Sequence, residues 1–118
     1  MSKAEDMSRL VELAHLMLDH RLGRLRTSAD RLEQSRMQLG AINRIAEPAD
    51  LDPVIAAKVA LGYDRWADVR RAELNLVIAR QTATWLGAQG EARTAFGRVQ
   101  ALQGVAARLN AQRGDSQR

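Results

Sequence analysis

The sequence contains no cysteine, two prolines and few aromatic residues. The lack of cysteine excludes a disulfide framework and any cysteine-ligated metal site, and it suits a reducing compartment. Aromatic residues make up 3% of the chain, against 46% for all hydrophobic residues, and alanine and leucine supply most of that apolar content. Such a composition favours helices packed closely side by side over a bulky globular core or a β-sandwich.

The sequence also has no long hydrophobic run and no recognisable catalytic motif. No apolar run approaches the ~20 residues that span a bilayer, and the opening "MSKAEDMSRL" mixes acidic with basic residues, unlike a secretory signal. HExxH, GxSxG and glycine-rich phosphate loops are absent. His15 and His20 lie about 140° apart around a helix, too far to share a metal ion. We therefore expect a soluble, cytoplasmic protein that is not an enzyme and has no catalytic, cofactor-binding or metal-binding residues.

Charge is unevenly distributed along the chain. Residues 80–118 carry six arginines against Glu91 and Asp115, which accounts for the whole net charge of +4, and the rest of the chain is balanced. Arginine makes planar, bidentate contacts with carboxylates and phosphates. The basic C-terminal third therefore predicts an acidic surface on a partner protein, with nucleic acid as the other possibility.

One short segment divides the chain. Residues 47–53, "EPADLDP", hold both prolines and three acidic residues, the composition of a connection. Ser2 with Glu5 matches a capping box at a helix start, and Asp52 before Pro53 matches an N-cap followed by a proline at the first helical position. The pattern predicts a single all-α domain over residues 1–118, with a helix over about 3–46, a turn over about 47–53 and a helix over about 53–113.

A hydrophobic repeat of alternating four- and three-residue steps runs through both predicted helices. In the first helix it comprises Leu18, Leu22, Leu25, Ala29, Leu32, Arg36 and Leu39. In the second it comprises Leu74, Ile78, Gln81, Trp85, Ala88, Ala92, Ala95, Val99, Leu102, Ala106 and Leu109. We call these interface positions the seam, and His15 falls in the same register, partly buried. A sustained repeat of 3.5 residues is typical of a left-handed coiled coil, and the short connection makes the helices antiparallel neighbours. We therefore predict two long helices that form an antiparallel coiled-coil hairpin, with a bundle of shorter helices as the alternative.

The position of the turn predicts which residues face each other. If the turn is centred on residues 47–53, paired residue numbers sum to about 98–100, and the first helix ends opposite about residue 96. Seam residues beyond that point would have no partner within the chain: Val99, Leu102, Ala106 and Leu109. An unpaired apolar stripe normally meets another surface. We therefore predict that this segment, together with Arg98, binds a partner that has an apolar lining and an acidic rim.

Two glycines bear on the length of the second helix. Gly114 follows Arg113 and is predicted to end the helix. Gly62 offers an alternative, because a break there would shorten the second helix until both helices finish level. The C-terminal segment would then be paired within the chain.

Three other glycines lie at regular spacing in the second helix. Gly90, Gly97 and Gly104 are seven residues apart and share one face, opposite the seam, which Ala83 and Ala111 extend. Each glycine costs ~1 kcal/mol relative to alanine in a helix interior. This outward stripe is either tolerated at exposed positions or forms a slim surface against which another protein packs.

The second helix resembles that of a known family. "GYDRWADVRRAELNLVIARQTATW" followed by "ARTAFGRVQALQGVAARLNAQR" is similar to the C-terminal helix of the FliJ/YscO family of type III export stalk proteins. The shared features are an aromatic pair near the hairpin turn, a helix rich in arginine and glutamine, and a late "AF-R---L" segment. The resemblance covers about residues 60–112 and, more weakly, the first helix.

Members of this family are two-helix antiparallel coiled coils that sit in the central hole of the export ATPase hexamer and contact the export-gate membrane protein and export chaperones. The resemblance implies a cytoplasmic stalk or chaperone component of flagellar or type III export, attached at the inner membrane through partners and monomeric or weakly oligomeric. It places the gate-contacting surface at Tyr63, Trp66 and Arg70, whose aromatic rings could instead pack on the first helix. The alternatives are a coiled-coil adaptor or oligomeric assembly factor unrelated to export and, with less support, an arginine-rich nucleic-acid-binding protein.

Overall fold

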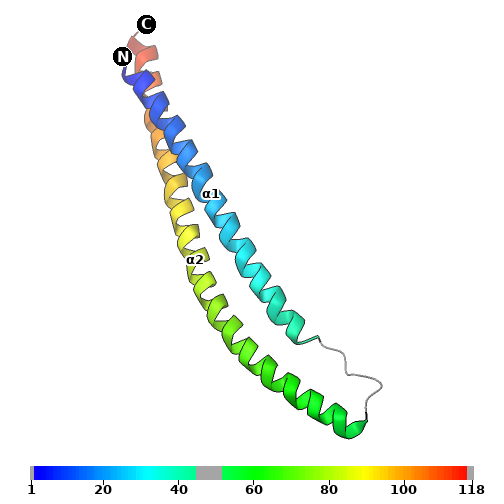
Figure 1. Cartoon of the computed structure of the whole chain (residues 1–118). Helices are drawn as coiled ribbons and strands as arrows, with labels where there is room; N and C mark the ends of the chain where they lie inside the picture. Colours follow the sequence, from blue (N-terminus) through cyan, green and yellow to red (C-terminus); the bar gives the residue numbers. More distant parts are fainter. Residues whose placement is uncertain (1, 45–51, 117–118) are drawn as a thin grey trace. The chain divides into compact units, whose positions relative to one another are not determined.

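The computed structural model describes residues 2–44 and 52–116 of the chain. These residues form two helices, α1 (Lys3–Ile42) and α2 (Pro53–Ser116), and contain no strand. Figure 1 shows α1 in blue to cyan and α2 in green to red, running in opposite directions. The predicted all-α fold of two long helices in an antiparallel hairpin is confirmed.

Both helices begin at the predicted caps. The Ser2 hydroxyl accepts a hydrogen bond of 3.2 Å from the Glu5 amide. The Asp52 carboxylate accepts one of 3.0 Å from the Val54 amide, and Pro53 occupies the first helical position. Each of these contacts satisfies one of the amides that the start of a helix leaves without an internal partner.

The end of α1 differs from the prediction. The helix ends at Ile42 rather than near residue 46. The next two residues form a tight turn, in which their amides donate hydrogen bonds of 3.2 Å to the carbonyl groups of Gly40 and Ala41. These three-residue hydrogen bonds tighten the last turn, as is common at a helix end. Most of the predicted turn, residues 47–51, lies outside the described residues.

The glycines of α2 do not interrupt the helix. α2 passes through Gly62 and continues through Gly114 to Ser116, so Gly114 does not end it and the alternative of a break at Gly62 is wrong. No glycine among the described residues adopts a positive φ. A glycine inside a helix costs ~1 kcal/mol of stability relative to alanine. The hydrogen bonds and packing of a helix this long outweigh that cost, so the helix continues.

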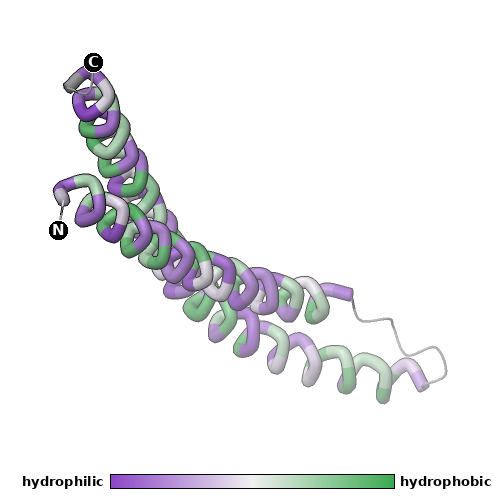
Figure 2. Tube along the Cα trace, turned by 90° about the horizontal axis from the view of Figure 1, so that it is seen from above, coloured by the Kyte–Doolittle hydropathy of each residue, from purple (hydrophilic) through white to green (hydrophobic). Residues whose placement is uncertain are grey.

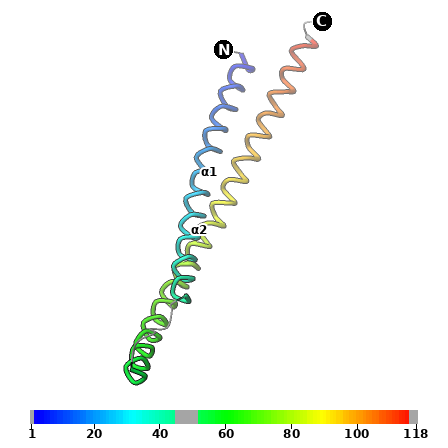
Figure 3. Tube along the Cα trace, turned by 90° about the vertical axis from the view of Figure 1, so that its right-hand side faces the viewer, coloured from blue at the N-terminus to red at the C-terminus, as the bar shows by residue number. Residues whose placement is uncertain are grey.

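The described chain forms two units, each of which contains part of both helices. Unit 1 comprises Met1–Ser28 with Trp85–Arg118, and unit 2 comprises Ala29–Thr84. Figure 3 shows the helix segments of unit 1 antiparallel, with blue α1 facing orange α2. Figure 2 shows hydrophilic and hydrophobic residues alternating along both helices. Such alternation is expected of helices that bury a single face.

The seam of α2 is confirmed in both units. Its residues in unit 1 are buried (Ala88, Ala92, Ala95 and Val99) or half-buried (Trp85, Leu102, Ala106 and Leu109). In unit 2 the apolar core consists of Ile42 from α1 with Ala67 and Leu74 from α2, against which Leu39 and Tyr63 pack. The small alanines of unit 1 leave room for a close approach of the two backbones.

The predicted seam of α1 is only partly right. Its leucines face inward, but Arg36 is exposed and the neighbouring Ser35 is buried instead. Ser28 is likewise more buried than the predicted Ala29, and the Ser28 hydroxyl donates a hydrogen bond of 2.8 Å to the Leu25 carbonyl. A serine whose hydroxyl bonds to its own helix can occupy a seam position. His15, which was expected to be partly buried, is exposed.

Candidate partner-binding surfaces

Side-chain contacts between the helices fix the pairing register. They are Arg21 with Glu91, His15 with Gln103, and Asn43 with Arg71, each at 3.1 Å. The residue numbers in these pairs sum to between 112 and 118, not to about 98–100. A given residue of α1 therefore faces a residue of α2 that lies about two heptads further along the chain than predicted.

The displaced register overturns the predicted C-terminal overhang. Val99 is only 3% exposed, and Leu102 and Leu109 are half-buried in the seam of unit 1. These three side chains pack within the chain, and Leu102 also borders a groove on the surface of unit 1. Arg98 is exposed, on the flank of the seam. The prediction failed because it assumed that the helices pair symmetrically from the turn outward.

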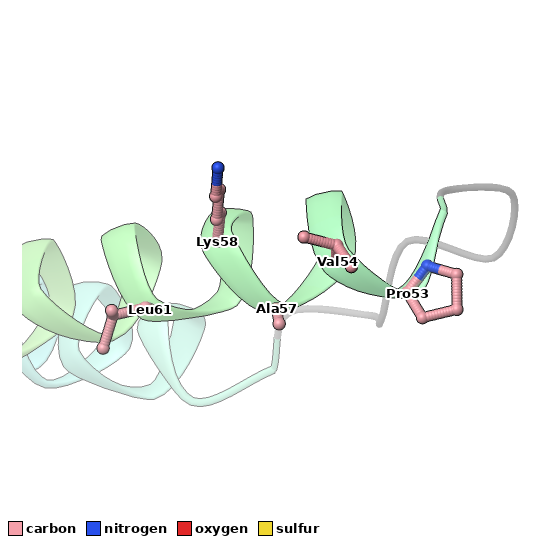
Figure 4. Close-up of a pocket in the computed structure, with 5 residues that line it drawn as sticks. All are labelled: Pro53, Val54, Ala57, Lys58 and Leu61. Carbon is pink, nitrogen blue, oxygen red and sulfur yellow. The ribbon is translucent and has the colours of Figure 1, made fainter.

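The part of α2 that has no partner among the described residues of α1 lies at its start instead. Ile42, at the end of α1, is level with Tyr63 and Ala67, so the turns formed by residues 53–61 lie beyond the end of α1. Large apolar side chains on these turns are exposed: Val54, Ile55, Val59 and Leu61. Figure 4 shows Leu61 and Ala57 on one side of the helix and Lys58 pointing away from them. A shallow apolar depression runs along these turns from Pro53 to Leu61, and Val54, Ala57 and Lys58 also line it.

The structure separates the roles of the two predicted aromatic residues. The Tyr63 hydroxyl donates a hydrogen bond of 2.6 Å to the Ile42 carbonyl, and its ring packs on the core of unit 2. Trp66 is 53% exposed, with its ring centroid 5.5 Å from that of Tyr63. The alternative of packing on the first helix therefore holds for Tyr63, and Trp66 presents half of its side chain to solvent.

Trp66 and Arg70 share a shallow groove in unit 2. Gln38, Ala41 and Ile42 line it from α1, and Leu74 lines it from α2. The Arg70 guanidinium donates a hydrogen bond of 3.2 Å to the Glu73 carboxylate, on its own helix. The groove thus combines an exposed indole, a positive charge and an apolar floor. Its use as a binding surface stays a prediction.

The glycine stripe is exposed. A Cβ atom added at Gly90, Gly97 or Gly104 would meet no atom within 4 Å. Packing within the chain therefore does not require glycine at these positions. Both interpretations of the stripe, tolerance and a slim contact surface, remain open.

Unit 1 carries a further exposed apolar set that the sequence analysis missed. Leu10, Leu13 and Met17 are each about half exposed, on one flank of the seam. A heptad phased on Val11 and Leu18 places these three residues beside the interface positions. That phase was the available signal, and it was missed because His15, and not the half-buried Ala14, was placed in the seam.

The described residues of both helices contain no segment long and apolar enough to cross a membrane. They also contain no group of three or more histidine, aspartate or glutamate side chains that could hold a metal ion. Comparisons of the chain with protein-family models, with curated proteins and with solved structures find no match. The resemblance to export stalk proteins therefore enters below only as part of a proposal.

Proposed function

We propose that this protein is a non-enzymatic coiled-coil stalk or chaperone component of a flagellar or type III protein-export apparatus, which engages the export ATPase ring and the export gate. The observation that carries the proposal is the two-helix hairpin. In the described residues the helices bury only each other, and the depressions on their surfaces are shallow. Substrate sites are usually concave and enclosed, whereas exposed grooves along helices suit the binding of other proteins.

The surface near the start of α2 supports contact with an export gate. Trp66 and Arg70 lie together in one groove, and both positions are those that the family resemblance assigns to this contact. Exposed tryptophan and arginine side chains are enriched among residues that dominate binding energy at interfaces.

Contact with an ATPase ring would use the outer surface of the hairpin, because the C-terminal seam is occupied. The exposed stripe of Gly90, Gly97 and Gly104 lacks side-chain bulk and suits passage through a narrow opening. The basic residues of the C-terminal third would face acidic residues of such a ring.

Binding to purified partners tests the proposal. We expect the full chain to co-sediment with the export ATPase of the same organism and to bind the cytoplasmic domain of the export gate. Trp66→Ala should weaken the gate contact at least about tenfold, since a central tryptophan is commonly worth 2 kcal/mol or more at an interface. Val69→Ala is the matched control, because Val69 is also a large, exposed hydrophobic side chain and lies outside the groove. A full chain that binds neither the export ATPase nor the export gate would contradict the proposal.

A coiled-coil adaptor or oligomeric assembly factor is the second candidate. Exposed apolar side chains occur on both flanks of the seam in unit 1, with Leu13 on one flank and Phe96 on the other. Such flanks could be buried by self-association. Sedimentation distinguishes the candidates, because the stalk should be a monomer or weak oligomer alone and the adaptor a stable dimer or tetramer.

A further inference from the structure

A shallow groove lies between the two helices of unit 1. Leu10, Leu13 and Met17 form its α1 wall, and Arg98 and Leu102 form its α2 wall. Half-buried Ala14 and buried Ala95 form the floor and keep the two backbones close, and the exposed Ala101 also lines the groove. The groove is separate from the Trp66 groove of unit 2 and from the surface formed by residues 53–61.

The residues of the α1 wall are unusual for a two-helix coiled coil. Positions that flank the seam normally carry charged residues, but Leu10, Leu13 and Met17 are apolar and 46%, 58% and 45% exposed. Their spacing of three and four residues places them in one row on α1. Together with the seam they make an apolar face wider than one partner helix can cover.

This geometry suits a third helix. A groove between two antiparallel helices accepts a helix whose anchors recur at i, i+3, i+4 and i+7, as in helical bundles and helix-in-groove complexes. The alanine floor lets the backbone of such a helix approach closely. The leucine and methionine side chains would pack on either side of its apolar anchors.

The charges around the groove point to an acidic occupant. By heptad position, this flank carries four basic residues and three acidic residues in unit 1: Lys3, Arg24, Arg98 and Arg108, with Asp6, Glu91 and Asp115. Glu91 is already occupied, since its carboxylate lies 3.1 Å from the Arg21 guanidinium and 3.7 Å from that of Arg24. Within the described part of the chain, no ion pair joins Arg98 or Arg108 to a carboxylate.

The opposite flank of unit 1 has the reverse balance. It carries three acidic residues against two arginines: Glu5, Glu12 and Asp19, with Arg26 and Arg93. The net positive charge is therefore specific to the flank that holds Leu10 and Leu13. A second copy packed symmetrically on this groove would bring the same arginine-rich rim against itself, which is unfavourable.

We propose that the Leu10–Leu13–Met17 groove is a docking site for an amphipathic helix of a partner protein, with apolar anchors flanked by aspartate and glutamate. The apolar row supplies the buried contact, and Arg98 and Arg108 supply the orientation and the preference for acidic flanks. This docking site does not depend on the export function proposed above.

Two designed peptides of about four heptads test the proposal, since shorter helices are marginal in water. The acidic peptide has leucine at its a and d positions and glutamate at e and g, where like charges disfavour pairing with itself. The basic peptide has lysine at e and g and is otherwise identical. Fluorescence anisotropy of each labelled peptide is measured against the full chain at low and at high salt.

We expect the acidic peptide to bind at least about tenfold more tightly than the basic peptide, with a preference that falls as salt screens the charges. Leu13→Glu should weaken binding of the acidic peptide at least about tenfold. Arg98→Glu should weaken it too and should strengthen binding of the basic peptide, a gain that a misfolded variant could not give. Leu86→Glu is the matched control, because Leu86 is equally exposed in unit 1 and lies outside this groove.

Equal affinity for the two peptides would overturn the proposal, as would full binding by the Leu13→Glu variant with unchanged helicity. Sedimentation across a range of protein concentrations supplies a further test. A stable dimer that Leu13→Glu dissociates would show that a second copy occupies the groove, and this result would also overturn the proposal.

Discussion

At the residue scale, the Tyr63 hydroxyl satisfies a carbonyl at the end of α1. Ile42 is the last residue of that helix, and its carbonyl lacks the amide that a further turn would supply. The Tyr63 hydroxyl donates to it at 2.6 Å from a half-buried position. Tyr63→Phe removes the donor and keeps the ring, so we expect it to lower the free energy of unfolding by ~1 kcal/mol. Urea unfolding measures this change, and a variant as stable as the original would show that water replaces the hydroxyl at no cost.

The two tryptophans provide a matched comparison at the same scale. Trp85 occupies a seam position and is half-buried, whereas Trp66 is 53% exposed. Truncating a well-packed tryptophan costs ~3–5 kcal/mol, and partial burial reduces this for Trp85→Ala to about 2 kcal/mol. Trp66→Ala should change stability by less than ~1 kcal/mol. Thermal melts of the two variants check the prediction, which fails if Trp66→Ala is the more destabilised.

Which residues face inward could be predicted for α2 but only in part for α1. Every α2 seam position from Trp85 to Leu109 is apolar, so only one set of residues fits the inward face of the helix. In α1 the inward positions include Ser28 and Ser35, whereas their neighbours Ala29 and Arg36 fitted the predicted steps equally well. For Ser28, hydropathy favoured the wrong neighbour, Ala29, whereas for Ser35 the chosen four- and three-residue steps selected Arg36 despite its charge. The burial of Ser28 is helped by the hydrogen bond of its hydroxyl to the helix backbone, which a hydropathy pattern does not contain.

At the element scale, the glycine stripe makes α2 less stable than it could be. Alanine at Gly90, Gly97 or Gly104 would add a methyl group in open space without backbone strain. Each substitution should raise stability by about 0.5–1 kcal/mol. The effects should add, because positions seven residues apart are about 10 Å apart on a helix. A triple variant with an unchanged melting temperature would contradict this prediction.

The same variant addresses the meaning of the stripe. If the glycines are only tolerated, the triple alanine variant gains stability and keeps every binding activity of the protein. If a partner packs closely on the stripe, the variant gains stability and loses that binding. The measurement is partner binding beside a thermal melt on one sample. A methyl group is a small change, so a loss of binding would indicate direct backbone contact.

At the scale of the whole molecule, the register decides which surfaces are free. The caps and helix types followed from local sequence, because Ser2 and Asp52 act within their own turns. The pairing register did not follow from local sequence. It depends on how many residues of α2 precede Tyr63, which contacts the end of α1. With the wrong register, the C-terminal end of α2 was predicted to extend beyond α1, whereas in the structure the N-terminal end of α2 does so. It led to the prediction that Val99 and Leu102 form a free binding surface, whereas both lie in the seam of unit 1.

Truncation after Phe96 is predicted to destabilise the protein. The removed segment contains Val99, which is buried, and the half-buried Leu102 and Leu109. Losing this apolar contact with α1 should cost about 4 kcal/mol or more, at 1.5–3 kcal/mol for each fully buried side chain. A thermal melt of the truncated chain measures the loss, and an unchanged melting temperature would indicate that the segment is unpaired after all.

The pairing register itself can be measured directly, because the absence of cysteine allows spin labels to be placed at chosen pairs. His15→Cys with Gln103→Cys labels two residues whose side chains lie 3.1 Å apart. His15→Cys with Leu86→Cys labels nearly the pair that a symmetrical turn would bring together. Double electron–electron resonance should give the shorter distance for the first pair, with the second longer by most of the about 26 Å of helix between residues 86 and 103. A shorter distance for residues 15 and 86 would contradict the register and every surface assigned from it.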